Sequence, residues 1–399
     1  MYSKSLLEKY ADVLVWGLTT SRTSAYAEGD IVLLQFQAPA LKLAEALYTK
    51  LLERGIHPVF RMGLTAPMER DLFMKGNDDQ VTFYPPGTRE LYESLNGTVY
   101  ILSPDSLTHL QHVNSKRIAA AAVARKPYRD ILNRREEEGL LGWTLCLYPT
   151  PELAKYAGLS LDEYGNQIAK ACMLDQSDPT AAWKTVFEEA NTIKTWLNSL
   201  RATTFHVESD DIDLTVSMGK FRRFIGISGH NIPSFEIFTS PDWRYCSGTF
   251  YADQPSYRSG NLVRGVRLTF DNGRAVSVSA EEGEDFVKEQ LAMDDGANKI
   301  GEFSLTDKRF SKIDAFMANT LFDENYGGEN GNCHIAVGSA YTDTYTGDPV
   351  TLTSKARKEL GYNDSALHWD LVNTQKKRVR AKLESGEWIT VYDDGQFTY

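Results

Sequence analysis

The chain has 399 residues, of which 42% are hydrophobic, and its formal net charge is −11. A chain of this length exceeds what one hydrophobic core usually serves, so we expect two domains. The negative charge argues against a nucleic-acid partner, because a nucleic-acid-binding surface needs a basic stripe.

The beginning of the chain lacks the pattern of a secretion signal. Charged residues interrupt the region where a signal peptide needs an apolar core, and they are Lys4, Glu8, Lys9 and Asp12. No later apolar run reaches the length of a membrane span, so we expect no membrane partner. The cysteines are scattered without a C-x-x-C pair, at Cys146, Cys172, Cys246 and Cys333. This usage fits free thiols in a reducing compartment, and we expect a cytoplasmic protein.

The first part of the chain alternates strand and helix patterns. Apolar residues at helical spacing predict an opening helix over residues 4–17. Residues 29–37, 38–55 and 56–62 then read as strand, helix and strand, with Gly55 as the helix stop. Such a unit predicts parallel strands joined by a right-handed crossover. Two further buried strands are expected at 98–103 and 144–148.

No phosphate-binding motif accompanies these strands. Neither a G-x-G-x-x-G turn nor a Walker A lysine is present, so we interpret this half as a scaffold or lid. Residues 151–200 read as helical, with Asp178 and Pro179 at the start of the last helix. We therefore predict an N-terminal α/β and helical domain over residues 1–200, with a short parallel sheet.

The second part of the chain favours antiparallel strands. The segment 270–273 (FDNG) lies between two strand patterns and predicts a hairpin, and a helix is expected near 283–292. We predict an α+β C-terminal domain over residues 201–399, with a mainly antiparallel sheet that carries a metal site.

Possible metal ligands are concentrated between residues 294 and 370. They are carboxylates, imidazoles and a phenol that lie among glycines, namely Glu302, Glu324, His334, Tyr341, His368 and Asp370. Hard oxygens and imidazole nitrogens are the ligand types that hold divalent cations. In an extended segment, His368 and Asp370 project to one face, so both can reach one ion while Trp369 packs behind them. Alone, each of these residues is more simply an ordinary polar group, but their clustering favours a site.

An earlier carboxylate joins this group. Glu236 lies in the segment SFEIFTSP, where alternation puts Phe235, Ile237 and Thr239 on the opposite face of a strand. A carboxylate on an otherwise apolar strand needs a partner if it is buried. His230, nearby, reads more simply as a structural histidine than as a residue that supports the metal site.

Six separated blocks resemble a known family. They are GHNIPSFEIFTSPD (229–242), LTFDNGRAV (268–276), DDGANKIGE (294–302), LFDEN (321–325), CHIAVGSAY (333–341) and NDSALHWDLV (363–372). Together with the N-terminal pattern, they resemble the metallo-aminopeptidase family of aminopeptidase T, aminopeptidase II and aminopeptidase S. The resemblance looks closest to the aminopeptidase S type of Gram-positive bacteria, and it covers essentially the whole chain.

The resemblance implies a metal-dependent aminopeptidase that acts on short peptides and forms a homodimer. It implies two divalent ions per subunit, such as zinc, cobalt or manganese, which activate a water and polarise the scissile carbonyl. The implied ligands are Glu236, Glu302, Glu324, His334, His368 and Asp370. Glu302 and Tyr341 would be the catalytic residues, Glu302 as the bridge between the ions and Tyr341 as a hydrogen-bond donor to the oxyanion. Which glutamate moves the proton stays open.

One departure from the family pattern leaves an alternative ligand. The segment YGGENGN (326–332) is inserted between LFDEN and His334, so Glu329 competes with Glu324 for the ligand position. We favour Glu324 because its local match is longer.

Other functions remain alternatives at this stage. Neither H-E-x-x-H nor G-x-S-x-G is present, which disfavours a thermolysin-like peptidase and an α/β-hydrolase. A metal-dependent sugar isomerase or a two-carboxylate glycosidase could also use Glu236 and Glu302, and the aromatic content of 11% would suit sugar stacking. An inactive binding module that kept the fold is a third alternative.

Overall fold

The computed structural model describes residues 2–399, and this chain divides into two compact units. The first unit runs up to Trp183 and includes the returning segment Ser228–Pro233. The second unit comprises Lys184–Ile227 and Ser234–Tyr399. The domain boundary near residue 201, with domains 1–200 and 201–399, stays a prediction.

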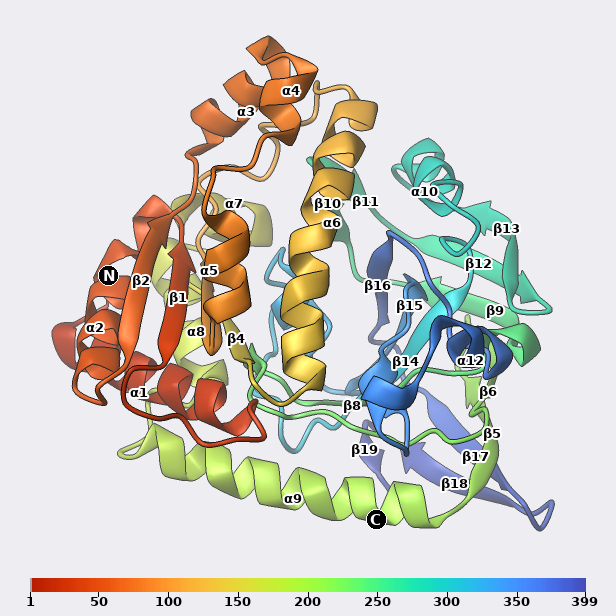
Figure 1. Ribbon diagram of the computed structural model, residues 1–399. Coiled ribbons are helices and arrows are strands. Elements are labelled where there is room, and N and C mark those ends of the chain that lie inside the picture. The colour runs from red at the N-terminus through yellow and green to blue at the C-terminus, as the bar shows by residue number, and fades with distance from the viewer. Residues whose placement is uncertain (1) are drawn as a thin grey trace. The chain divides into compact units, whose positions relative to one another are not determined.

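The first unit contains a five-stranded parallel sheet (Figure 1). Its strands, in spatial order, are β2 (His57–Met62), β1 (Ile31–Phe36), β3 (Gly97–Leu102), β4 (Gly142–Leu147) and β7 (Asn231–Ile232). The predicted strand–helix–strand unit is confirmed, because β1 and β2 are parallel neighbours. The short strand β7, which comes from the returning segment, was not predicted.

Helices cover both faces of this sheet. The helices of this unit are α1 (Lys4–Thr20), α2 (Leu41–Leu52), α3 (Ala66–Lys75), α4 (Asp78–Thr82), α5 (Thr88–Ser94), α6 (Ser115–Glu137), α7 (Pro151–Ala157) and α8 (Leu161–Ala171). Of these, α3 and α4 pack against α6 through Phe73, Val81 and Ala121. On one face, Leu33 of β1 packs with Tyr92 of α5 and Ile131 of α6. On α1, the Tyr10 hydroxyl donates a hydrogen bond to the backbone oxygen of Leu147 in β4. The opening helix is thus confirmed, whereas α3 to α6 were not assigned from sequence.

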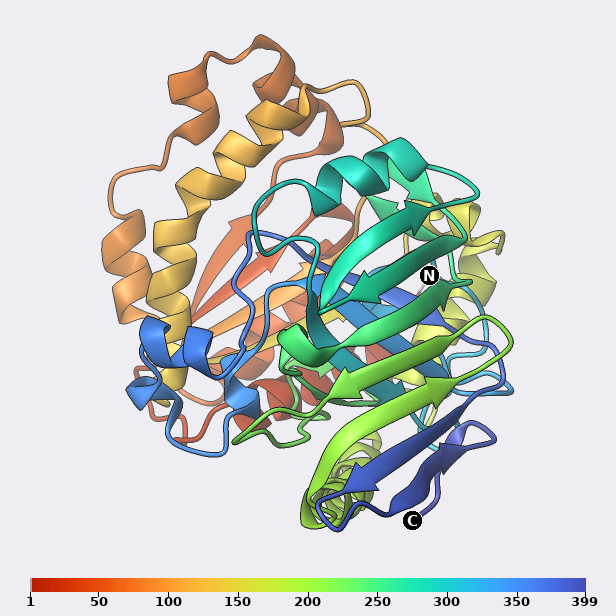
Figure 2. The same cartoon turned by 90° about the vertical axis from the view of Figure 1, so that its right-hand side faces the viewer.

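The long helix α9 (Pro179–Ser199) leads to the second unit, and Asp178 caps its start as predicted. In this unit, eight antiparallel strands form the larger sheet (Figure 2). In spatial order they are β13 (Arg274–Ser279), β12 (Val266–Asp271), β9 (Ser247–Ala252), β6 (Asp213–Ser217), β5 (Ala202–Glu208), β17 (Arg378–Leu383), β18 (Trp388–Asp393) and β19 (Gln396–Phe397). The predicted hairpin is β12–β13, and both of its turn residues, Asn272 and Gly273, have positive φ angles.

A second antiparallel sheet of four strands lies in the same unit. Its strands, in spatial order, are β16 (His368–Asn373), β15 (Asn332–Gly338), β14 (Ile300–Thr306) and β8 (Glu236–Thr239). A small hairpin, β10 (Ser256–Arg258) with β11 (Asn261–Val263), and the helices α10 (Glu284–Leu291), α11 (Thr320–Asp323) and α12 (Ser354–Glu359) complete it. The predicted fold class, a parallel α/β part followed by a mainly antiparallel α+β part, is confirmed.

One face of the four-stranded sheet contributes to the core of the second unit. The ring of Phe303 in β14 lies 5.9 Å from the ring of Phe205 in β5, and both are buried. Because side chains alternate along a strand, Glu302 and Ser304, which are the neighbours of Phe303, project to the opposite face.

Among the described residues, no helix combines the length and apolar character needed to cross a membrane.

Candidate metal centre

Four neighbouring strands bring five of the six predicted ligands to the smaller sheet, namely Glu236, Glu302, His334, His368 and Asp370. The strand register pairs Glu236 of β8 with Thr306, and His334 of β15 with Ser304. On its other side, β15 pairs Ala336 with Asp370 of β16. Antiparallel partners project to the same face, so residues distant in sequence become neighbours here.

Two small residues make room for this cluster. Ala336 is paired with Glu302 on one side and with Asp370 on the other, so only a methyl group stands between the two carboxylates. A register shift in β14 occurs between Ile300 and Glu302. A Cβ atom on the intervening Gly301 would lie 2.4 Å from the backbone oxygen of Gly338, so only glycine fits there.

His334 is the centre of the most buried group. Its Nε2 atom lies 3.2 Å from Glu236 Oε2 and 3.2 Å from Glu302 Oε1. The donor atoms of these three side chains all lie within 4.8 Å of one another. Burial alone would lower the pKa of His334, but hydrogen bonds to Glu236 and Glu302 raise it well above its usual value. One histidine and two carboxylates with converging donor atoms form a possible cation site.

His368 and Asp370 form a second group beside the first. His368 Nε2 lies 3.4 Å from Asp370 Oδ1 and 3.8 Å from Glu302 Oε2. The predicted same-face projection of the two residues is therefore confirmed. His368 Nδ1 lies 2.9 Å from the backbone oxygen of Ser339. Since a carbonyl can only accept, Nδ1 carries a proton, and in the neutral imidazole Nε2 then has the lone pair for a ligand.

Glu302 connects the two groups, because one of its oxygens faces His334 and the other faces His368. Its side chain is 4% exposed. Burial and the negative charge of Glu236 outweigh the hydrogen bond from His334 and raise the pKa of Glu302 to about 7. In the absence of a cation, this carboxyl group thus retains a proton more readily than an ordinary glutamate.

Glu324 lies at the end of the short helix α11 and is buried. The residues on either side anchor this turn. Asp323 accepts hydrogen bonds from the backbone N–H groups of Met317 and Asn319, and Asn325 accepts one from the N–H of Phe235. The backbone oxygen of Glu324 accepts hydrogen bonds from Thr306 of β14 and Asn332 of β15. Burial and the charges of Glu236 and Asp370 raise the pKa of Glu324 well above its usual value.

Glu329 occupies a different environment, because its side chain is exposed. Its backbone oxygen accepts a hydrogen bond from Lys308. The structure therefore brings Glu324 to the carboxylate cluster, whereas Glu329 lies on the surface of the inserted loop.

Tyr341 follows β15 and stands at the edge of the cluster. Its ring centroid lies 4.8 Å from that of His368 and 5.8 Å from that of Phe238. Its backbone N–H donates a hydrogen bond to Ser240 Oγ, which fixes the start of the turn. Although the residue is 44% exposed, desolvation and the charges of Glu302 and Asp370 raise the pKa of Tyr341 well above its usual value. The hydroxyl group is therefore protonated at neutral pH and can donate a hydrogen bond.

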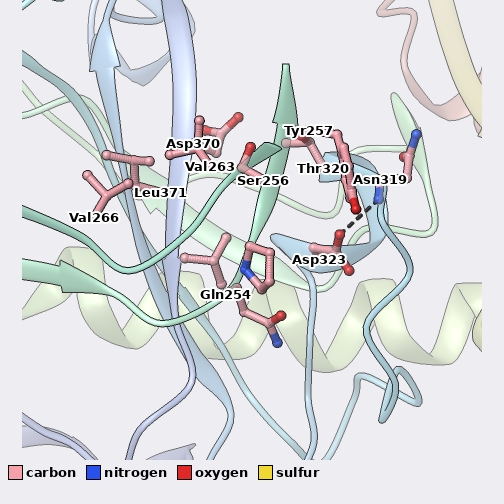
Figure 3. Close-up of a pocket in the computed structure, with 12 residues that line it drawn as sticks. Gln254, Ser256, Tyr257, Val263, Val266, Asn319, Thr320, Asp323, Asp370 and Leu371 are labelled. Carbon is pink, nitrogen blue, oxygen red and sulfur yellow. Dashed lines mark hydrogen bonds between the residues drawn. The ribbon is translucent and has the colours of Figure 1, made fainter. Parts of the chain in front are cut away.

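A small pocket adjoins Asp370. Its walls are residues 254–257, Val263, Val266, 319–320, Asp323 and 370–372 (Figure 3). Figure 3 also shows the hydrogen bond between Asp323 and the backbone of Asn319. The pocket thus lies between β16, which carries Asp370, and the start of α11.

The chemistry of the donor set fits divalent cations. Four carboxyl groups that are buried or nearly buried lie here, those of Glu236, Glu302, Glu324 and Asp370. Within the described residues, Glu236, Glu302 and Asp370 form ion pairs with His334 and His368. Close carboxylates cannot all ionise without a compensating positive charge, as the raised pKa values of Glu302 and Glu324 indicate. Oxygen and imidazole ligands are those that zinc, cobalt and manganese accept.

Some supporting residues were not identified from the sequence. Ser339, Ser240 and Asn325 act through a backbone oxygen, a hydroxyl group and an amide, and nothing in their spacing indicates these contacts. Ala336 could have been found, since it lies two residues after His334 and therefore on the same face. His230 belongs to the first unit, where its ring contacts Ser228 and Glu136.

Comparisons with known proteins agree with the sequence resemblance. The family described as thermophilic metalloprotease (M29) matches residues 3–397. Aminopeptidase T of Thermus aquaticus is 30% identical over 307 residues, which are 72% of this chain and 73% of that protein. Aminopeptidase PepS of Streptococcus thermophilus is 25% identical, and the alignment covers 99% of this chain and 98% of that protein. The structure of wild-type AmpT from Thermus thermophilus has a similar fold, with a TM-score of 0.82, 23% identity and 99% coverage of both chains.

Proposed function

The chain belongs to the M29 metalloprotease family and is a metallo-aminopeptidase, and we propose that it cleaves the first peptide bond of short peptides at a two-metal centre. The sugar isomerase and glycosidase alternatives give way to this family membership. The central position of Glu302 between two histidine–carboxylate groups is the observation that carries the two-metal proposal.

The proposed ligands form two overlapping sets. Glu236, Glu302 and His334 would hold one divalent ion, and Glu302, His368 and Asp370 would hold the other. Glu324 completes the donor set from the side of α11. Bound there, zinc, cobalt or manganese ions would supply Lewis acidity for the scissile carbonyl and make a water molecule acidic near neutral pH.

The protein side chains have separate tasks in this proposal. The hydrogen bond from His368 Nδ1 to Ser339 holds its ring in one tautomer, with Nε2 directed to Glu302 and Asp370. A carboxylate of the cluster accepts the proton of the attacking water. Tyr341 donates a hydrogen bond to the substrate oxygen on which negative charge develops, a role that its protonated state supports.

The test is a metal titration coupled to a peptidase assay. Protein dialysed against a chelator should lose hydrolysis of a panel of amino-acid p-nitroanilides, and cobalt, zinc or manganese should restore it. Metal analysis of the restored enzyme should give two ions per chain. Full activity after exhaustive chelation would contradict the metal dependence, whereas full activity with one ion would contradict only the two-metal arrangement.

Further proposals concern the state of the protein in the cell. We propose a homodimer in the cytoplasm, with residues 1–200 acting as scaffold or lid rather than supplying ligands. All proposed ligands lie in residues 201–399, and the four cysteines are buried free thiols, as expected in a reducing compartment. Light scattering at micromolar concentration tests the dimer, and a monomer would contradict it. Cleavage of peptides of two to five residues, but not of folded proteins, is the expected substrate range.

A further inference from the structure

A segment of the second unit runs along the outer edge of the ligand-bearing strand β16. Because β16 is the first strand of its sheet, the polar backbone groups on its outer edge have no partner strand in that sheet. The backbone N–H of Gln254 donates to the oxygen of Val372, and Arg258 Nη1 donates to the oxygen of His368 over 3.1 Å. These two hydrogen bonds flank Asp370, so the segment fixes the edge of β16 on both sides of the proposed ligand.

Arg258 has further contacts that hold its guanidinium group in place. Its Nε atom lies 3.3 Å from Gln290 Oε1, and its Cζ atom lies 5.5 Å from the centre of the Trp369 ring. The indole N–H of Trp369 in turn donates to Ser256 Oγ over 3.1 Å. The strand β10 therefore contacts both the side chain of Trp369, which lies between His368 and Asp370, and the backbone of His368.

The charge of Arg258 also reaches the proposed ligands. Its guanidinium is partly buried and close enough to Asp370 for their opposite charges to stabilise each other.

We propose that Arg258 is a positioning residue for the His368–Asp370 half of the metal centre. This inference rests on the proposed function and adds a residue that holds ligands without being one. The hydrogen bond to the His368 backbone fixes where the first ligand leaves the strand, and the contact with the Trp369 ring holds the residue between the two ligands. Outer partners of this type commonly change metal affinity by about 10–100-fold when they are removed.

The test is calorimetric titration of metal-free protein with Co²⁺, together with the visible absorption of the bound cobalt. Arg258→Gln should weaken binding of one ion by about 10–100-fold and alter the cobalt spectrum, and should leave the other ion close to wild-type affinity. Arg258→Lys, which keeps the charge but not the planar fork, should give a smaller loss. Arg267→Gln is the matched control, since that arginine bonds to Asp211 and lies over the Tyr251 ring. The control should bind both ions as the wild type does.

Each outcome of this titration decides one question. Wild-type affinity for both ions in a folded Arg258→Gln variant would overturn the inference, and so would an equal weakening of both ions. If Arg258→Gln does not fold, Arg258→Lys and Ser256→Ala take its place. Wild-type affinity for both ions in both of them would overturn it. Failure of the wild-type protein to bind Co²⁺ would instead contradict the proposed function, so the two failures are distinguishable.

Discussion

Two histidines with carboxylate neighbours, one in each unit, differ in what surrounds them. In the first unit, His230 Nδ1 lies 2.6 Å from Ser228 Oγ, and its Nε2 lies 3.1 Å from Glu136 Oε1. The same Glu136 oxygen accepts a hydrogen bond from the indole N–H of Trp143, whose ring packs on His230. One carboxylate, one imidazole and neutral donors thus form a locally balanced group.

The second unit has the opposite balance. A single nitrogen of His334 is shared by Glu236 and Glu302. The buried Glu324 and the nearly buried Asp370 add two more carboxyl groups whose charges act on the same cluster. A histidine beside an acid is therefore not by itself the sign of a metal site. The excess of buried acid over base is the feature that requires a cation.

The largest expected effect comes from removing the residue shared by both groups. Glu302→Gln should lose metal and reduce kcat by at least about 10³-fold, the upper end of what a single transition-state contact supplies. Glu136→Gln, the corresponding change at His230, should keep both ions and most activity. Metal analysis and steady-state kinetics of the two variants test this contrast. An unchanged metal content in Glu302→Gln would remove the basis for treating the two histidine groups differently.

The second-largest effect is expected at Tyr341, and it shows whether this residue is a hydrogen-bond donor or a metal ligand. Tyr341→Phe should retain both ions and lower kcat and kcat/KM together by about 10²–10³-fold, because a donor to the oxyanion acts only in the transition state. KM should stay near the wild-type value. Loss of metal from this variant would make Tyr341 a ligand or a structural support of the centre.

A matched pair of glutamates tests the role of the inserted loop. Glu324→Gln should weaken metal binding by at least the roughly 10–100-fold that loss of an outer partner costs. Glu329→Gln should bind metal as the wild type does, because its side chain is exposed on the loop. Calorimetric titration with Zn²⁺ measures both. A larger loss in Glu329→Gln than in Glu324→Gln would mean that the loop supplies the ligand in solution.

Much of this site could be predicted from the sequence, because side chains alternate along a strand and the spacing of the ligands shows which of them share a face. His368 and Asp370 could be assigned to one face from their spacing alone, and the structure puts their side chains 3.4 Å apart. The choice between Glu324 and Glu329 could not be made from spacing, because the insertion changes the distance to His334. It depends on tertiary contacts, in which Asn325 ties the end of α11 to Phe235.

Some elements of the fold could be predicted from the sequence, and others could not. The alternating strands β1 to β4 and the helices α1, α2 and α9 have strong apolar periodicity. By contrast, α6 has Pro127 in its interior and a charged end, so its pattern does not read as one helix. Strand β7 is only two residues long and pairs with a strand far earlier in the chain. No local signal can report such a pairing.

A smaller effect is the pH dependence of metal-free stability. The folded-state pKa of Glu302 is raised from 4.5 to about 7, mainly by burial, and that of His368 is raised from 6.5 to about 9, where the charge of Asp370 outweighs burial. A raised folded-state pKa stabilises the protein below the unfolded value, and this stabilisation is lost as pH rises through the folded value. Chelated protein should therefore lose thermal stability between pH about 4.5 and about 9.

Thermal melts of chelated and metal-loaded protein across this range check the sign. Bound ions replace the retained protons, so the dependence should shrink in the loaded protein, and Glu302→Gln should flatten the lower part of the chelated curve. If the stability of the chelated protein instead rises with pH over this whole range, Glu302 and His368 do not retain protons in the folded state as proposed.

The smallest effect is expected at His230, and it tests the other side of the comparison. His230→Gln removes one imidazole from a group that already contains balanced partners, so the loss should be limited to local contacts with Ser228, Glu136 and Trp143. Such contacts are typically worth about 0.5–1.5 kcal/mol of stability each, and part of that is screened because the side chain of His230 is 20% exposed. Metal content, kcat and the cobalt spectrum should match the wild type, since no carboxylate excess is created or removed. A loss of bound metal in this variant, with an unchanged thermal unfolding temperature, would mean that a balanced histidine–carboxylate pair also supports the centre. The acid excess would then no longer distinguish the two regions.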